Sequence, residues 1–595
     1  MKQSRSSWYI HVSFIVAAAV LSFVLHQAPY VFSSRPYSIG ADGDSAFHFA
    51  IQMKLRDPTL FPKDIELNEM VLSSRPTFEF AIHRVVVWLA DHLFKGNLFV
   101  ANVAIYWCYH LLFLVGCYLL GLFVLRLPGG AALFTAALVG LSKAFSAWWG
   151  MAYGAVIPKY IGLTLIPWFI LGYLRWAQYP WRLVILFFAL GLFVNVYPLL
   201  PLYLALILLA VTFSRSKRPW SLGIGMGIAF SVAGLPSVLT FAMDTFAKRG
   251  TLSGQEQVIL EVLLMRHYGY ALLDLKYTAG SLISPVWFTL IVAGVGWLLQ
   301  QRGADLDEVE SRFFGHLSVG VVILGFVGIA ANLAGRIRYG LAHILLVCLW
   351  VGFFLLRAAR AGLFSKWFRI KSSGVEGLFL LFTVWTMALS LAGLVVGVIY
   401  RPLVTLLLYR ASVFLYVPAY MGSVWLAMYW IRQRTAAGRV LGVGIALVIL
   451  LSGAVNTALV YRLRGARVAQ ISEPYYALAD WAAQNTPVYS LFMTPYGLRT
   501  DTFFAFRVYA MRGVLLNWVA GEMVISNPRL ATRFWEMSND IGPLYAQASG
   551  TADFVRVARK YRVDYIVTDP ATLRTPDLPI AYQNEVYTVF TVPPE

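Results

Sequence analysis

The stretch "YSIGADGDSAFHFAIQMKLRDP", Tyr37–Pro58, decides how the fold of this chain is interpreted. It follows the first long apolar run and holds two aspartates, a histidine and an arginine close together. Charged side chains are costly inside a bilayer, so a segment of this kind belongs to a loop outside the membrane. The sequence therefore predicts membrane helices that alternate with polar loops, and this stretch lies in the first long loop, residues 29–97.

The composition also indicates a membrane protein. Hydrophobic residues make up 59% of the 595 positions and charged residues only 13%, which leaves too little polar surface for a soluble domain. The formal net charge of +19 lies mainly in short loops between apolar runs, as the positive-inside rule expects. Because no basic stripe alternates with exposed aromatic residues, we expect no nucleic-acid partner. The three cysteines lie in apolar runs, which excludes a disulfide framework and a cysteine-based zinc site.

Apolar runs of about 20 residues predict single helical crossings. Lys2 and Arg5 precede the first run and favour a cytoplasmic N-terminus. The run Leu183–Phe213 is too long for one helix and is predicted to form two, bent at Pro198 and Pro201. With these two, about thirteen segments and an outward C-terminus result. The other spans are expected near Trp8–Ala28, Leu98–Leu127, Ala131–Trp148, Lys159–Trp176, Ser221–Ala242, Leu282–Leu299, His316–Leu333, Tyr339–Leu356, Val375–Tyr400, Pro402–Ile431 and Val440–Tyr461.

The apolar stretch Phe78–Lys95 is not counted as a span. Its charged residues make a position at the bilayer centre costly, and four residues recur at helical spacing on one face: Arg84, Trp88, Asp91 and Lys95. We therefore predict an amphipathic helix that lies in the membrane interface.

The opening stretch is expected to form a helix that starts near Asp44. Such a helix carries polar residues four apart on one face, namely Asp44, His48, Gln52 and Arg56. A carboxylate, an imidazole and a guanidinium would then point in one direction. The alternative is that Asp44 only caps the helix, while Asp42 solvates a glycine turn.

Several basic residues fall in predicted outward loops, where a positive-inside protein should have few. Arg266, His267, Arg338 and Lys159 are of this kind, and together they indicate a bound anion. Each could instead extend to lipid headgroups. Arg410 lies within a predicted span, where an unpaired charge costs about 2.5 kcal/mol or more. A lipid phosphate or diphosphate could pair with its guanidinium, and a structural ion pair is the alternative.

From Ile471 onward the pattern changes to a near-neutral sequence in which helices alternate with short strands. This predicts a small α/β domain over residues 471–595, behind a membrane domain over residues 1–470. Helices are expected in "EPYYALADWAAQN", "PRLATRFWEM" and "TADFVRVARKY". Strands are expected in "VYSLFM", "FRVYAM", "VDYIVTD" and "EVYTVFTV". Arg507 and Arg512 could contact a glycan, but a surface or sheet-edge position is the more common case and we expect no catalytic role there.

This architecture resembles the GT-C superfamily of polytopic glycosyltransferases. The stretch "DSAFHFAIQMKLRDPTLFP" looks like the first-loop motif of lipid A aminoarabinose and protein mannosyl transferases, in which an acidic residue begins a helix that ends in an Asp and an aromatic–Pro pair. On that match Asp44 takes the catalytic position, and His48 falls where relatives often place a tyrosine. "IPKYIGLTLIP" is similar to a Pro-basic motif that would put Lys159 near the lipid phosphate, and "MRHYGY" resembles an outer-loop motif that lacks its second histidine here.

The resemblance implies an inverting transfer of a sugar from a polyprenyl-phosphate donor to a glycan, lipid or protein acceptor outside a bacterial inner membrane. Asp44, with Asp42 as the other candidate, would be the base, and His48 would orient it or the acceptor. Arg410, Lys159 and Arg266 would stabilise the leaving phosphate. The Asp42–Asp44 spacing is similar to metal-binding carboxylates of oligosaccharyltransferases, but a second acidic loop motif is absent from the sequence, which leaves a divalent metal ion open.

Two other functions fit part of the pattern. A transporter or flippase for a lipid-linked anion would also use outward arginines and a helix broken at prolines. However, the sequence shows no inverted repeat, and this function leaves the acidic first loop unexplained. A non-catalytic scaffold for envelope assembly would make Asp42 and Asp44 dispensable.

Overall fold

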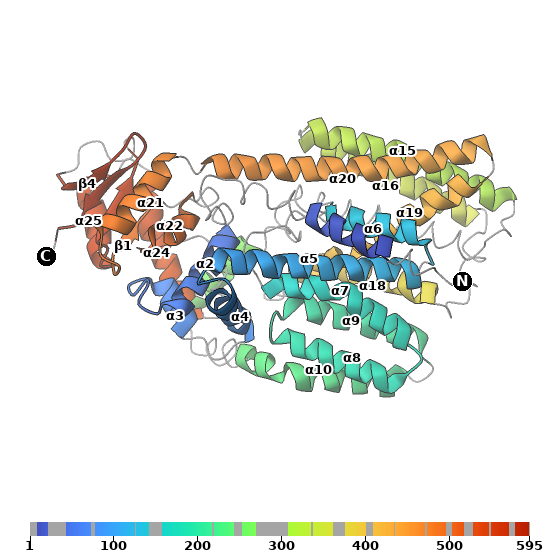
Figure 1. The fold of residues 1–595 in the computed structure, drawn as a ribbon, viewed down its shortest axis with the longest axis horizontal. Coiled ribbons are helices and arrows are strands. Elements are labelled where there is room, and N and C mark those ends of the chain that lie inside the picture. Colours follow the sequence, from blue (N-terminus) through green and yellow to red (C-terminus); the bar gives the residue numbers. More distant parts are fainter. Residues whose placement is uncertain are drawn as a thin grey trace.

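The computed structural model describes residues 9–21, 43–72, 78–124, 126–141, 158–216, 219–242, 253–268, 308–334, 337–360, 375–399, 408–433, 435–470, 473–495, 502–516, 528–546, 549–569 and 577–593. Over these ranges the chain is predominantly helical, with a small sheet near the C-terminus (Figure 1). After helix Tyr9–Leu21 the first half contains α2 (Gly43–Arg56), α3 (Ile65–Leu72), α4 (Phe78–Leu93), α5 (Leu98–Phe123), α6 (Gly129–Leu141), α7 (Pro158–Trp176), α8 (Pro180–Val194), α9 (Leu199–Arg215), α10 (Pro219–Ala242) and α11 (Gly254–Tyr268). The second half contains α15 (Glu308–Ala334), α16 (Ile337–Arg360), α18 (Val375–Ile399), the 3₁₀ helix η5 (Leu408–Leu415), α19 (Tyr416–Arg432) and α20 (Ala436–Gln470).

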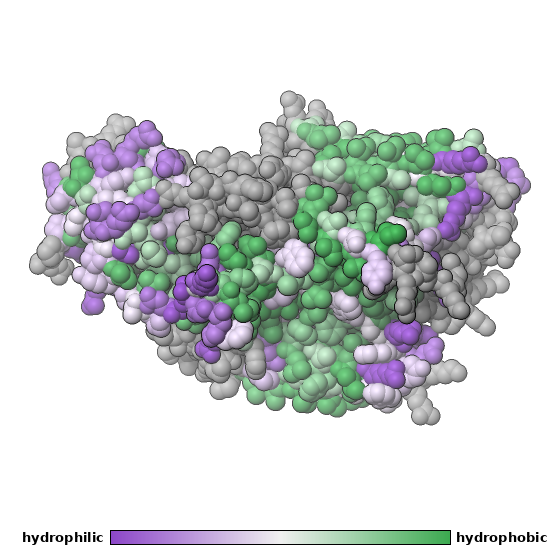
Figure 2. Space-filling model, viewed as in Figure 1, coloured by the Kyte–Doolittle hydropathy of each residue, from purple (hydrophilic) through white to green (hydrophobic). Residues whose placement is uncertain are grey.

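The long helices have the properties of membrane-spanning segments. Within the described residues, four stretches are long and apolar enough to cross a bilayer: Leu98–Phe123, Pro219–Ser237, Glu308–Ala331 and Arg410–Arg432. Figure 2 shows a broad apolar band over the helical part, with hydrophilic residues gathered toward the two ends of the molecule. Along α10 the exposed residues Ile224, Ile228, Val232, Leu235 and Leu239 form an apolar stripe at helical spacing. The protein is therefore a helical membrane protein. The total of about thirteen spans stays a prediction, since Leu282–Leu299 lies outside the described residues.

The predicted break in the run Leu183–Phe213 is confirmed. Helix α8 ends at Val194 and α9 begins at Leu199, directly after Pro198. Asn195 fills the gap between them, because its Nδ2 donates to the carbonyl of Ala233 at 2.8 Å and its Oδ1 accepts from the backbone N–H of Ser237 at 3.1 Å. These groups flank Pro236 in α10, where the proline removes a helical hydrogen bond. One side chain thus bonds to backbone groups of a neighbouring helix on both sides of its proline.

Two predicted spans differ in detail. The segment Pro402–Ile431 was expected to be one helix, but its described part starts as η5 before α19 begins. The last span continues without a break to Gln470, so α20 has 35 residues and reaches the C-terminal segment. The predicted amphipathic helix is present as α4, and the four residues assigned to its polar face are exposed.

The C-terminal segment folds into the predicted α/β arrangement, with two strands that the sequence analysis missed. Its strands β1 (Leu491–Met493), β2 (Gly513–Val514), β3 (Tyr565–Thr568), β4 (Ile580–Gln583) and β5 (Thr588–Thr591) form a sheet in the order β2-β1-β3-β5-β4. Strand β1 is parallel to β2 and β3, whereas β5 is antiparallel to β3 and β4. The helical elements are α21 (Glu473–Asn485), the 3₁₀ helix η6 (Thr502–Ala505), α22 (Phe506–Ala510), α24 (Pro528–Ala546) and α25 (Thr551–Lys560).

The prediction that "FRVYAM" is a strand was wrong. Residues Phe506–Ala510 form the short helix α22, and all five side chains are buried. The β-branched and aromatic composition favours a strand, but burial on every side and the ion pairs of Arg507 described below override that preference. The helix ends at Met511, whose φ of 51° reverses the chain into β2.

Three segments far apart in the sequence pack into one unit at the end of the helical bundle, which we call the cap: α2–α4, α11 and the C-terminal α/β segment (Figure 1). Phe47 and Ile51 of α2 share an apolar core with Tyr475 and Phe506 from the C-terminal segment. Leu260 and Leu263 of α11 belong to a second core with residues of α24 and α25. These three segments must consequently lie on the same side of the membrane.

Candidate functional site

Helix α2 begins at Gly43, which confirms the helix predicted to start near Asp44. Asp44 lies in its first turn, while Asp42 lies outside the described residues. The polar face of α2 is nevertheless not open as expected. His48 is 9% exposed and Gln52 is fully buried, because α2 packs against α4 and the start of α5. Sequence periodicity identified the face but not the helices that cover it.

A chain of buried hydrogen bonds starts at His48. Its Nδ1 lies 3.1 Å from Nε2 of His83 in α4, and Nδ1 of His83 lies 3.3 Å from Nε2 of Gln52. Gln52 and Asn102 of α5 then exchange two amide hydrogen bonds, of 3.1 and 2.7 Å. The chain ends where Asn102 Nδ2 donates to the carbonyl of Leu98 at 2.7 Å. Burial, followed by the nearby ring of His48, lowers the pKa of His83 well below its ordinary value, so this imidazole stays neutral.

Arg56, the last member of the predicted polar face, has a structural contact instead. Its Nε pairs with Asp91 of α4 at 2.9 Å, and its Nη1 donates to the carbonyl of Gly96 at 2.7 Å. Gly96 has a φ of +81°, so the chain turns there from α4 into α5 under the arginine. Arg56 thus fastens the end of α2 to this turn rather than joining His48.

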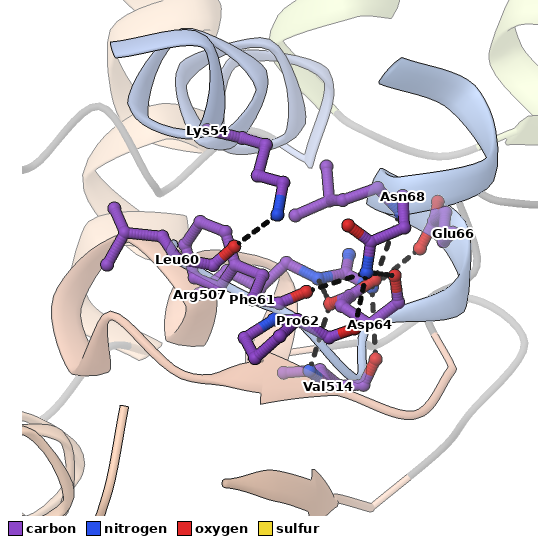
Figure 3. A network of polar contacts seen from close by, with 10 residues as sticks. Lys54, Leu60, Phe61, Pro62, Asp64, Glu66, Asn68, Arg507 and Val514 are labelled. Atoms are coloured by element: carbon purple, nitrogen blue, oxygen red, sulfur yellow. Dashed lines mark hydrogen bonds and ion pairs between the residues drawn. The ribbon is translucent and has the colours of Figure 1, made fainter. Parts of the chain in front are cut away.

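The turn after α2 is held by two polar side chains (Figure 3). Lys54 donates from Nζ to the carbonyls of Pro58 and Leu60 at 2.8 and 2.6 Å. Burial lowers the pKa of Lys54 although nearby carboxylates act in the opposite direction. Asn68 donates to the carbonyls of Phe61, Pro62 and Asp64, each at 2.8 Å. The Asp–aromatic–Pro end of the first-loop motif is therefore a fixed turn whose exit positions Asp64.

Asp64 and Glu66 form a buried ion-pair cluster with Arg507 of α22 (Figure 3). Arg507 Nε lies 2.7 Å from Asp64 Oδ2, and its Nη2 lies 2.6 Å from Glu66 Oε2. Asp64 also accepts from the backbone N–H of Val514 at 3.1 Å, and Arg507 donates to the carbonyl of the same residue. Burial alone would lower the pKa of Arg507, but the charges of Asp64 and Glu66 outweigh burial and raise it. Arg507 was expected at a surface, yet it is 1% exposed and joins the first loop to the C-terminal segment.

Arg512 also lies inside the protein rather than at a sheet edge. It is 4% exposed, and it donates to the hydroxyl of Thr486 at 2.9 Å and to the carbonyl of Ala483 at 2.7 Å. These bonds hold the end of α21. Both arginines are therefore buried and bond to groups of the protein, rather than lying at a surface or a sheet edge.

The predicted phosphate-binding residues lie on helices near the boundary between the bundle and the cap. Lys159 is in the first turn of α7, where its Nζ lies 5.7 Å from the ring centre of Tyr160. Tyr160 contacts Tyr106 of α5, one turn beyond Asn102. Arg410 lies at the start of η5, and Leu415 at the end of η5 shares an apolar cluster with Leu260 and Leu263.

The remaining predicted residues are placed only by their helices. Arg266 and His267 are near the end of α11, and Arg338 is at the start of α16. Within the described ranges no group of three or more potential metal-ligating side chains occurs. Asp42 is not among those residues, so the divalent metal left open by the sequence is not tested.

Comparison with solved structures shows a likeness of fold. No family model matches the chain, and no curated protein matches it. Among solved structures, the chain is similar to the apo oligosaccharyltransferase of Archaeoglobus fulgidus, with 14% sequence identity and a TM-score of 0.42 over 95% of this chain and 70% of that one. At this TM-score we take neither family nor function from the likeness.

Sequence reasoning missed His83 and Asn102, although a signal for His83 was present. In Phe78–Lys95, the residues His83, Val86 and Ala90 recur at helical spacing opposite the charged face, and all three are buried. A histidine on that apolar face should face the core. Its partner on α2 could not be predicted, because the contact joins helices 35 residues apart in the sequence.

Proposed function

We propose that this protein is an integral-membrane inverting glycosyltransferase that moves a sugar from a polyprenyl-phosphate donor to an acceptor on the outer face of a bacterial inner membrane. The observation that carries the proposal is the position of α2, the helix with Asp44 and His48. It is built into the cap, and the helices that carry Lys159 and Arg410 reach the same end of the bundle through Tyr160 and Leu415. We therefore assign acceptor activation to Asp44 in the cap and binding of the lipid phosphate to Lys159 and Arg410 in the bundle.

The orientation of the membrane supports the proposal. Helices α7, α9, α16 and α19 each end with an arginine in the last turn, as expected for cytoplasmic ends under the positive-inside rule. The first loop, α11 and the C-terminal segment pack together on one side, which agrees with the sequence assigning all three to the outer face. In this orientation the N-terminus is cytoplasmic and the cap meets acceptors outside the cell.

The chemistry requires one proton transfer and one displacement. The acceptor hydroxyl oxygen attacks the anomeric carbon, its proton passes to the carboxylate of Asp44, and the bond from the anomeric carbon to the phosphate oxygen breaks. The electron pair leaves with the polyprenyl phosphate, whose charge Lys159 and Arg410 stabilise. Attack opposite the leaving group inverts the anomeric centre.

Turnover by the full chain in proteoliposomes tests the proposal. The probes are undecaprenyl phosphate carrying radiolabelled glucose, galactose, mannose or aminoarabinose, with envelope glycan, lipid and protein fractions as acceptors. We expect Asp44→Asn to abolish transfer while donor binding persists, and Arg410→Gln to weaken donor binding. Asp553→Asn, at an exposed i,i+3 ion pair on α25, is the matched control and should behave as the parent.

If Asp44→Asn and Asp42→Asn both retain parental transfer, the base assignment fails and Asp44 is only a helix cap. If the parent moves the intact labelled lipid between leaflets but transfers no sugar, the protein is a flippase and the proposal is wrong.

A further inference from the structure

The buried hydrogen bonds that link Asn102, Gln52, His83 and His48 determine which nitrogen of each side chain carries a hydrogen. The starting point is Asn102, whose side chain meets the carbonyl of Leu98 at 2.7 Å. A carbonyl oxygen can only accept, so the atom facing it must be the amide nitrogen. The same nitrogen donates to Gln52 Oε1 at 2.7 Å, and Asn102 Oδ1 is left as the acceptor that faces Gln52.

Gln52 passes this orientation to His83. One hydrogen of its Nε2 goes to Asn102 Oδ1 at 3.1 Å, and the same nitrogen lies 3.3 Å from His83 Nδ1. Two N–H groups cannot face each other at that distance without repulsion, so His83 Nδ1 carries a lone pair and accepts. A neutral imidazole that accepts at Nδ1 carries its hydrogen on Nε2.

His83 in turn sets the tautomer of His48. Its Nε2–H lies 3.1 Å from His48 Nδ1, which must therefore be the acceptor. Neutral His48 then carries its hydrogen on Nε2. Asp44 precedes His48 by four residues in α2, so the two positions share one face of the helix.

We infer that His83, Gln52 and Asn102 are positioning residues that hold His48 as the neutral Nε2–H tautomer, so that the N–H donor of this imidazole is Nε2, on a residue that shares one face of α2 with the proposed base Asp44. The inference rests on the proposed function, because it gives this network a task in orienting the base. A neutral donor fixes the direction of a carboxylate without adding a charge that would weaken it as a base. All members of the network are 9% exposed or less, so water does not compete for these bonds.

The first test measures the tautomer itself. The full chain, labelled with ¹⁵N-histidine and reconstituted in lipid, is studied by solid-state NMR at neutral pH, and His48→Gln identifies the His48 signals. We expect an unprotonated Nδ1 and a protonated Nε2 for His48. Gln52→Leu removes the donor to His83 and should give a mixture of tautomers at both histidines. A protonated Nδ1 on His48 in the parent would overturn the inference.

The second test measures transfer with the donor panel described above. Outer partners that orient a metal-ligating histidine are typically worth about ten- to a hundredfold in affinity or activity, and we expect the same scale for an oriented His48. We therefore expect His83→Phe and Gln52→Leu each to lower kcat by about that factor while KM for the donor lipid changes less than about twofold. The matched control is His92→Phe on the same helix, because His92 is exposed, bonds to the carbonyl of Trp88 in its own helix and stacks on the ring of that residue.

The two tests separate failure of the inference from failure of the proposed function. If the parent transfers sugar and Gln52→Leu, correctly folded by NMR, retains parental kcat, the positioning role is refuted while the transferase stands. If the parent transfers no sugar from any donor but shows the Nε2–H tautomer, the hydrogen-bond chain stands, and the proposed function and the task assigned to His48 both fall.

Discussion

Replacing Arg507 with leucine should loosen the contact between the first loop and the C-terminal segment. The change removes the bonds to Asp64 and Glu66 and leaves two carboxylates that are 0% and 8% exposed without their cation. Breaking a buried ion pair on one side typically costs about 3–5 kcal/mol. Asp64 keeps backbone N–H donors from Leu67 and Val514, which places the expected cost toward the lower end of that range.

Hydrogen–deuterium exchange in lipid nanodiscs measures this cost locally. Under conditions where exchange reports the opening equilibrium, 3–5 kcal/mol corresponds to a protection loss of about two to nearly four orders of magnitude. The loss should be confined to α2, α3, α21 and α22, while α8–α10 stay unchanged. Arg556→Leu, at an exposed ion pair on α25, is the control and should change protection by less than about fivefold.

A second variant identifies the cause. Arg507→Met combined with Asp64→Asn and Glu66→Gln removes all three charges, so it should recover part of the protection that the single change loses. Protection in Arg507→Leu equal to that in Arg556→Leu would refute the ion-pair reasoning. So would a triple variant that is less protected than the single one.

Three further predictions test other contacts. Lys63→Ala removes a partly exposed ion pair with Asp564 and should lower the local free energy of opening by at most about 1 kcal/mol, measured by hydrogen–deuterium exchange. A larger loss would contradict the small contribution expected of an ion pair near the surface. Gly96→Ala should lower the free energy of unfolding by about 1–2 kcal/mol and displace Arg56, because φ is +81° at this residue and the new methyl group would meet the guanidinium. An unchanged melting temperature would refute this. Burial holds the pKa of His83 well below 6.5, so the unfolded chain binds a proton there that the folded chain does not. The free energy of unfolding should therefore fall as the pH drops below about 6.5, by up to about 1.4 kcal/mol per pH unit. His83→Gln should flatten this pH dependence when melting is measured over a range of pH.

The parts of the fold that could be predicted are those governed by local physical chemistry. Apolar length identified most helices, proline chemistry located the break between α8 and α9, and helical periodicity placed the charged face of α4. The strand expected at Phe506 failed because its environment is set by contacts with α2 and α3, more than 400 residues earlier, as the Arg507–Asp64 pair illustrates. Propensity carries no information about such contacts.

The candidate site was predicted as a set of residues but not as an arrangement. The sequence placed His48 and Arg56 together on one face of α2, and the helix is present. The sequence could not predict which side chain contacts each of them. His48 lies against His83, and Arg56 pairs with Asp91. Both neighbours come from α4, which was assigned to the membrane interface by its own pattern alone.

The length of α20 limits how the cap can move. Its 35 residues span about 52 Å, whereas the hydrocarbon layer is about 30 Å thick, so its last turns rise well above the lipid before α21 begins. This continuous helix is the first attachment of the C-terminal segment to the bundle. The Asp64–Arg507 ion pair is the second, because it joins the same segment to the first loop, which continues into α5. Because the C-terminal segment is attached at two places, it cannot rotate away from the bundle about a single hinge. The height of the C-terminal segment above the lipid surface is therefore set by the length of this helix.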